Sequence, residues 1–317
     1  MSTLSGSRWG AAGPSTLDPE RVRGGGLGDA LRAYLAAVRL GWATEANWTD
    51  PFLFFIYSVA KPVSAALILV VMVEIVGGEA GRAFRGYVVT GSALWSFVIA
   101  GISGLAWSVL DDRERYRMLR YLYVSPASFA LLLVGRGTAR LTVGAMGALI
   151  TLAVGVVVLG LPLDPGRVDW PLLGVAMVGG LVAIVVIGIL MAAVCLQTRQ
   201  DSWSYPEAVA GSLFLVSGAV FPLAVLPQAV QLVGLATPLT WWLAGVRLAL
   251  FPDGPSVVGG EGSAWALLSG STAPTSVDIA LALLTTGALA TLAAAAVFRW
   301  SEHRARERGL IDQTSGS

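Results

Sequence analysis

The sequence predicts an all-α integral membrane protein with six transmembrane helices, an N-terminal amphipathic helix and re-entrant half-helices between spans five and six. Of its 317 residues, 55% are hydrophobic and 13% are charged, and the mean hydropathy is +0.72. An ordinary soluble domain is about one quarter charged. Apolar windows of about 20 residues, long enough to cross a bilayer, lie at 52–76, 87–110, 141–161, 171–196, 208–226 and 277–298.

The segments around these windows divide the chain. Residues 1–26 are rich in Gly, Ser, Pro and Arg without the apolar stretch of a signal peptide, so we expect a disordered cytoplasmic tail. Residues 27–50 form the next unit, in which apolar residues recur at three- and four-residue steps over 27–42. This pattern predicts an amphipathic helix in the cytoplasmic headgroup layer; the alternative is a soluble helix that packs on its own protein. Residues 51–300 hold the six spans, and 301–317 form a cytoplasmic C-terminal tail.

The connection between spans two and three, DDRERYRMLRYLYV over 111–124, has acidic residues first and arginines toward its end. This order suits the helix dipole, so we expect one helix with a charged face and protruding aromatics, suited to docking on a soluble partner. An ordinary solvated loop is the alternative. Arg136 and Arg140 follow in an apolar run. We place them at the cytoplasmic interface, because a charge at mid-bilayer costs roughly 3 kcal/mol.

The apolar stretch 208–251 carries only one charged residue, Arg247, and is interrupted by Pro222, Pro227 and Pro238. Proline opposes helix continuation, so we expect the helix that begins near residue 208 to end near 226, with two short helices over 227–251. Broken helices survive in lipid only when they pack on protein or line a cavity. Arg247 is either an interfacial anchor beside an aromatic belt or a contact for cargo or a lipid headgroup. An outer loop rich in Gly and Ser follows over 252–276.

The distribution of arginines predicts the orientation. With both termini inside, sixteen arginines are cytoplasmic, and only Arg82, Arg85, Arg167 and Arg247 are outside. Because Lys and Arg are retained on the cytoplasmic side, we expect an N-in, C-in topology.

Several classes of site are excluded by composition. The only lysine, Lys61, lies in no G-x-x-x-x-G-K-[ST] loop, so this chain cannot hold nucleotide phosphates by that device. One histidine, His303, and one cysteine, Cys195, exclude a paired histidine zinc site and an internal disulfide. No G-x-S-x-G elbow and no concentrated basic face are present, which argues against a hydrolase and a nucleic-acid partner. We therefore expect no enzyme, no bound cofactor and no metal, with ATP and Mg²⁺ held by another subunit.

Three stretches carry a resemblance to a known family. They are RERYRMLRYLYVSPASFALLLVGR (113–136), SGAVFPLAVLPQAVQLVGLATPLTWWLAGVRLALF (217–251) and FRWSEHRARERGLID (298–312). In this order the chain resembles the permease subunits of type 2 ABC (ABC-2) transporters, over about 27–312. It departs from the family pattern at Thr237, where Asn before the proline is common, and in its long outer loop.

The resemblance implies a pore of two permease copies, a homodimer or a heterodimer, with one ATPase subunit docked beneath each half. The segment 111–124 would be the coupling helix, with 27–42 as a second contact. The short helices over 227–251 would be a re-entrant element that caps the outer side. The implied coupling residues are Arg113, Glu114, Arg115, Tyr116, Arg117 and Arg120. The implied external gate comprises Pro222, Pro227, Pro238, Trp241, Trp242 and Arg247. Candidates for the substrate path are Trp95, Trp107 and Phe221.

This resemblance favours an exporter in the plasma membrane of a prokaryote. We expect an amphipathic small molecule or lipid as cargo, because the spans are apolar and aromatic; a lipid-linked glycan is the alternative. A secondary carrier or channel is a second class, for which Lys61 and Glu74 are nearly the only titratable groups inside the windows. A membrane-bound enzyme is a third class, but no catalytic constellation can be assembled from these residues.

Overall fold

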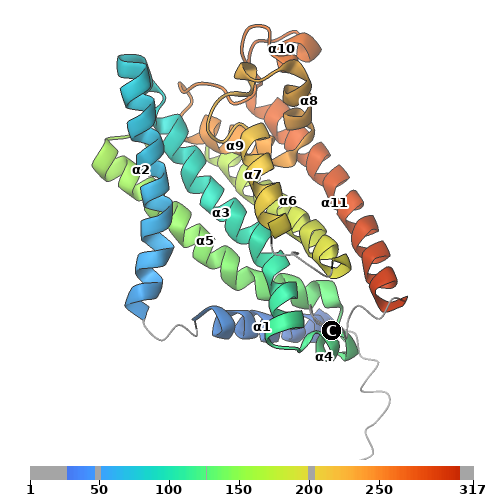
Figure 1. Ribbon diagram of the computed structural model, residues 1–317. Helices are drawn as coiled ribbons and strands as arrows, with labels where there is room; N and C mark the ends of the chain where they lie inside the picture. Colours follow the sequence, from blue (N-terminus) through green and yellow to red (C-terminus); the bar gives the residue numbers. More distant parts are fainter. Residues whose placement is uncertain (1–26, 47–50, 126, 199–203, 308–317) are drawn as a thin grey trace, which may run out of the picture.

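The computed structural model describes residues 27–46, 51–125, 127–198 and 204–307, and these form helices and turns without a β-strand (Figure 1). The expected tail 1–26 lies outside the described residues, as do residues 308–317 of the expected tail 301–317, whereas residues 301–307 continue the last helix. The helices are α1 (Leu27–Ala46), α2 (Pro51–Ala83), α3 (Arg85–Leu110), η2 (Asp111–Arg115), α4 (Leu119–Val124), α5 (Phe129–Leu159), α6 (Trp170–Gln197), α7 (Ser204–Val216), η3 (Leu223–Val225), α8 (Gln228–Ala236), α9 (Pro238–Leu250), α10 (Ala264–Ser269) and α11 (Ser276–Glu307).

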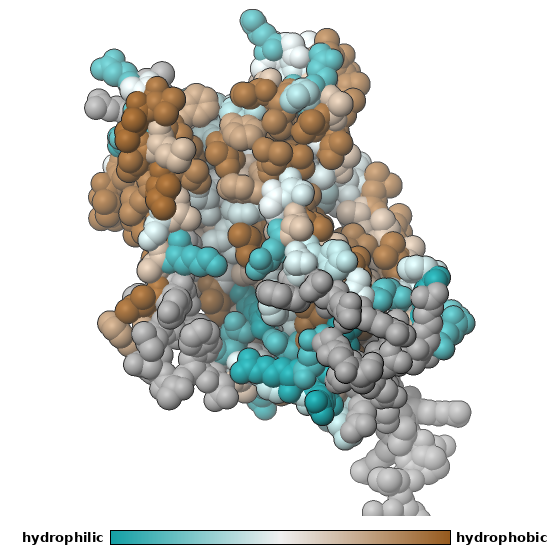
Figure 2. All heavy atoms as spheres, in the orientation of Figure 1, coloured by the Kyte–Doolittle hydropathy of each residue, from teal (hydrophilic) through white to brown (hydrophobic). Residues whose placement is uncertain are grey.

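The long helices run between two ends of the molecule that differ in polarity. α1 and α4 lie across the lower end of Figure 1, whereas α8 and α10 form the upper end. Figure 2 shows hydrophobic residues over much of the surface beside the long helices and hydrophilic residues gathered toward the lower end. The apolar sides are those expected of a protein surrounded by lipid. We call the end with α1 and α4 the inner end and the opposite end the outer end.

α3 is the central helix, buried along most of its length and packed against α2, α5, α6 and α7. Small residues allow this close approach, as is usual between helices in membranes. A Cβ at Gly101 would lie 2.0 Å from the Ile184 side chain of α6, and one at Gly144 of α5 would lie 2.3 Å from the Ala100 side chain. The same kind of contact joins α6 to α9, where the fully buried indole of Trp242 lies against Gly180.

The count of membrane spans differs from the six expected. Among the described residues, four unbroken helices are long and apolar enough to cross a membrane: Arg85–Arg115, Phe129–Leu159, Trp170–Gln197 and Ser276–Ala305. α8 and α9 pass the same test only as a pair bent by 84°. The structure therefore confirms an all-helical chain with four or five candidate spans and does not confirm six.

α2 covers the first expected window but reverses near its end. Gly78 has φ 55° and ψ −127°, a conformation that glycine adopts without strain. The chain then packs back, so that Glu74 forms an ion pair with Arg85 across 2.5 Å. Arg85 also donates to the Leu159 carbonyl at 2.8 Å, which ties α2, α3 and α5 together.

Candidate functional sites at the inner and outer ends

The connection after α3 is not the single helix expected over 111–124. It consists of the π-helical turn η2, a break at Tyr116–Met118 and the short α4. The amides of Tyr116 and Met118 donate to Asp111 and Asp112 carbonyls, both at 2.8 Å. Arg117 has φ 50°, a left-handed conformation that ends a helix. The order of the charges correctly predicted helical turns at 111–115 and 119–124, but it did not predict the break between them.

The six implied coupling residues separate into different environments. Glu114, Arg115, Tyr116 and Arg117 are exposed at the inner end, where a soluble protein can reach them. Arg120 lies in α4. Arg113 is buried: it donates to the Cys195 carbonyl at 3.1 Å and the Thr198 carbonyl at 2.9 Å, and pairs with Glu114 at 2.9 Å. Arg113 therefore fixes the turn to the end of α6 and is not part of the exposed surface.

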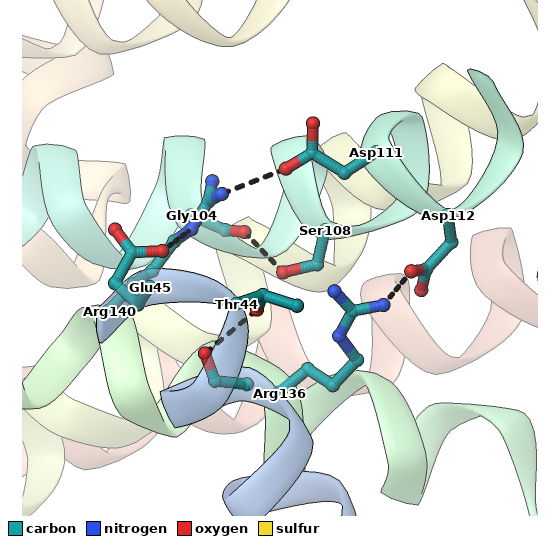
Figure 3. A network of polar contacts seen from close by, with 9 residues as sticks. Thr44, Glu45, Gly104, Ser108, Asp111, Asp112, Arg136 and Arg140 are labelled. Carbon is teal, nitrogen blue, oxygen red and sulfur yellow. Dashed lines mark hydrogen bonds and ion pairs between the residues drawn. The ribbon is translucent and has the colours of Figure 1, made fainter. Parts of the chain in front are cut away.

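A network of ion pairs joins this turn to α1 and α5 (Figure 3). Arg136 of α5 pairs with Asp112, and both side chains are almost fully buried. Arg140, one turn further along α5, reaches Glu45 of α1 and Asp111, each at 2.9 Å. The sequence placed both arginines near the inner interface but gave no signal for their partners, because ion pairs between distant segments have no local pattern. The network makes the exposed turn part of one rigid inner assembly.

α1 packs against α5 mainly through small residues, whereas several of its large apolar side chains are exposed. A Cβ at Gly41 would lie 2.6 Å from the Arg136 carbonyl, and one at Gly135 would lie 2.7 Å from the Ala37 side chain. Tyr34 and Thr138 share a hydrogen bond of 3.0 Å. The other face exposes Leu27, Leu31, Leu35 and Trp42. The helix thus combines the two readings of the sequence: it packs on its own protein and still presents an apolar stripe.

At the outer end, the helix expected over 208–226 stops much earlier. α7 ends at Val216, and Gly218 adopts φ 76° in the turn that follows. The prolines that predicted the break lie further on: Pro222 precedes η3, and Pro227 precedes α8. The two short helices expected next are confirmed, and Pro238 begins α9. At about 1.5 Å per residue, the 13 residues of α7 span only about 20 Å.

Arg247 occupies the break and is buried there, rather than exposed beside an aromatic belt. Its side chain is only 3% exposed. It donates to the carbonyls of Gly218 at 2.7 Å, Ala219 at 2.5 Å and Tyr87 at 2.9 Å. Its guanidinium also lies 3.5 Å from the ring centroid of Tyr87, whose hydroxyl donates to Gly218 at 2.6 Å. Carbonyls left free at a helix end need donors, and Arg247 provides them.

The remaining gate and path candidates lie largely inside the subunit. Trp242 is fully buried, and Trp241 is buried with its indole nitrogen donating to Leu235 at 2.8 Å. Trp95 is buried against Phe214 of α7, with ring centroids 4.9 Å apart. Trp107 and Phe221 are half-buried. Trp95 and both gate tryptophans therefore hold helices together in this conformation.

The loop 252–276 is folded onto the short outer helices. Gln231 of α8 donates to the Leu226 carbonyl at 2.7 Å and accepts the Ala264 amide of α10 at 2.6 Å. Leu223 donates its amide to Val257 at 2.8 Å, and Trp241 stacks edge-on against Trp265. These contacts join α8, α10 and the loop into one outer cap.

Comparison with known families decides what kind of protein this is. The sequence pattern of the ABC-2 type transporter matches residues 40–251, which extend from α1 through α9 and cover more than half of the chain. The chain belongs to the ABC-2 type transporter family. No curated protein matches it.

This ABC-2 protein is a multi-pass membrane protein and the permease component of an ABC exporter. Such components generally work with an ATPase in a separate subunit. Sequence reasoning missed Glu45, Tyr87 and Gly218. The glycine was visible as a potential break, but nothing in the sequence indicated that Glu45 pairs with Arg140 or that Tyr87 contacts Arg247.

Proposed function

We propose that two copies of this permease, each bound to an ATPase subunit at its inner end, export an amphipathic small molecule or lipid. The observation that supports this most is the exposed turn Glu114–Arg117, which continues α3. The buried Asp112–Arg136 pair and Arg113 fix this turn to α5 and α6, and the partly exposed Arg140 links it to α1. A force applied to the turn moves these helices together, because ion pairs and packed interiors deform little. ATP closure of the partner subunits would thereby tilt the spans.

The proposal includes an orientation and a place in the cell. The inner end carries the arginine-rich segments and would face the cytoplasm of a prokaryote, with the outer cap beyond the plasma membrane. α8 and α9, bent by 84°, would form a re-entrant element beneath that cap. The exposed apolar stripe of α1 would rest in the headgroup layer, and the helix would also provide the second contact region for the ATPase.

The choice of cargo rests on the apolar character of the helices. A conduit for a lipid-linked glycan would be expected to offer more amide, carboxylate and phenol groups, so the glycan is the second candidate. ATP hydrolysis by the reconstituted complex, measured with amphipathic drugs, phospholipids and glycolipids, distinguishes the two. If glycolipids alone stimulated hydrolysis, the cargo would be a lipid-linked glycan.

A secondary carrier is less well supported. Ion coupling needs a titratable group that is free to exchange protons or cations, and Glu74 is held by Arg85. If the permease without any ATPase moved cargo down an ion gradient, the ATP-driven proposal would fail.

The decisive test concerns the exposed turn. Tagged permease is purified from native membranes together with its ATPase, as the wild type and as Arg115→Ala/Tyr116→Ala/Arg117→Ala. We expect the triple variant to fold but to lose at least about tenfold in cargo-stimulated hydrolysis, because these exposed side chains make the contact. His303→Ala/Glu307→Ala removes an exposed ion pair elsewhere on the inner end and should retain activity. Full activity in the triple variant, or a purification that never yields an ATPase, contradicts the proposal.

A further inference from the structure

A cavity of about 460 Å³ lies at the outer end of each subunit. Its walls come from the start of α3, the α5–α6 connection, the second half of α9 and the loop after it. It is built within one chain and needs no second copy. Cavities of this size are typical of small-molecule sites.

Three arginines line this cavity, Arg85, Arg167 and Arg247, together with two aspartates, Asp164 and Asp253. Arg85 is balanced by Glu74, and Arg167 pairs with Asp253 at the exposed rim across 2.7 Å. Arg247 differs from both, because no carboxylate among the described residues pairs with it. Its acceptors are three neutral carbonyls, and its Nε–H has no hydrogen-bond partner in the described part of the chain.

A buried cation without a counter-charge is unusual in proteins. Charged groups are rarely fully buried unless they are paired, since desolvation costs more than neutral acceptors return. Arg247 bonds to the carbonyl of Tyr87 in the first turn of α3 and lines the same cavity as Arg85. Glu74 balances Arg85 and Asp253 balances Arg167, so the uncompensated charge at this cavity is that of Arg247. An anionic oxygen that enters the cavity would supply the missing counter-charge.

The rest of the wall is apolar. Leu161, Leu248, Leu250, Phe251 and Ile279 line the same cavity. An inorganic anion would leave these side chains in contact with water, whereas an amphiphile would cover them and gain about 25 cal/mol for each Å² of apolar surface removed from water.

We propose that this cavity binds an amphiphile with one anionic head, a phosphate or a carboxylate. The head lies against Arg85 and Arg247, and the apolar part lies against the leucines of α9. This goes beyond the proposed transport function, because binding requires neither ATP nor a partner subunit.

The test uses the full chain, purified in detergent and stripped of lipid, with dihexanoyl phosphatidylglycerol as the probe and calorimetric titration as the measurement. We expect saturable binding that is at least about tenfold tighter than binding of dihexanoyl phosphatidylcholine, because both lipids carry the phosphate but the choline cation cancels the net negative charge. Inorganic phosphate at the same concentration should not compete. Equal competition by phosphate would mean that the apolar wall contributes nothing and would overturn the proposal.

Two variants locate the binding. Glu74→Gln/Arg85→Gln removes one cation without leaving an unpaired carboxylate, and Leu248→Trp fills the cavity without changing any charge. Each should weaken phosphatidylglycerol binding by about tenfold or more, whereas His303→Ala/Glu307→Ala should bind like the wild type. Glu74→Gln alone leaves Arg85 unpaired and should bind at least as tightly as the wild type. Wild-type affinity in both test variants, or a loss in Glu74→Gln equal to that of the double variant, rules out this site.

Discussion

Asp112 and Arg136 form a buried ion pair between the turn after α3 and the first half of α5, with side-chain exposures of 2% and 3%. Breaking a buried pair leaves one charge without compensation and costs about 3 kcal/mol or more, whereas removing both charges costs much less. The pair therefore matters for stability mainly through the penalty for losing one member.

We expect Arg136→Met to lower the free energy of unfolding of the purified permease by about 3 kcal/mol. The measurement is its thermal unfolding midpoint, which should fall strongly. Asp112→Asn/Arg136→Met should recover most of that loss, since no buried charge is left over. The exposed pair Asp29–Arg32 on α1 provides the control, because surface ion pairs contribute only about 0–1 kcal/mol. If the double variant were as unstable as the sum of both single variants, the two charges would not be coupled.

At the scale of elements, the break between α7 and η3 depends on one backbone conformation. Gly218→Ala places a Cβ at φ 76° and within 2.6 Å of the Leu223 and Val257 side chains. The left-handed backbone alone costs about 1–2 kcal/mol for a residue with a Cβ, and the crowding adds to it. We expect a lower unfolding midpoint and loss of transport, because Arg247 loses the carbonyl geometry that it caps.

Gly211→Ala is the matched control within α7, since nothing lies within 4 Å of a Cβ there. Alanine favours a helix over glycine by about 1 kcal/mol, so this variant should be neutral or more stable. Equal effects of the two substitutions would show that the conformation at Gly218 does not determine the break.

These elements also show how far the sequence alone can predict the fold. Proline at 227 and 238 placed α8 and α9 correctly, because proline acts on its own backbone. The end of α7 was missed because Gly218 acts only together with Tyr87 and Arg247, which are distant in sequence. The segment 111–124 was predicted as one helix from dipole order, yet its turn is held by Arg113 bonding to α6. Local signals were therefore reliable where local chemistry decides, and failed where a distant donor or ion pair fixes the backbone.

At the scale of the whole molecule, the charge distribution and the arrangement of helices make one joint prediction of topology. α1, η2 and the end of α11 lie at the inner end, and the outer cap lies at the other (Figure 1). Sixteen arginines fall on the inner side in the N-in, C-in arrangement, against four outside.

Because the native Cys195 is fully buried, single cysteines can be introduced without a background of labelling. In intact cells, a membrane-impermeant maleimide should label Gly262→Cys and leave Arg32→Cys, Arg115→Cys and His303→Cys unlabelled; in inverted vesicles the pattern should reverse. Labelling of His303→Cys from outside would contradict this topology. The chain would then cross the membrane an odd number of times, and the C-terminal end of α11 would lie on the side opposite the proposed ATPase surface.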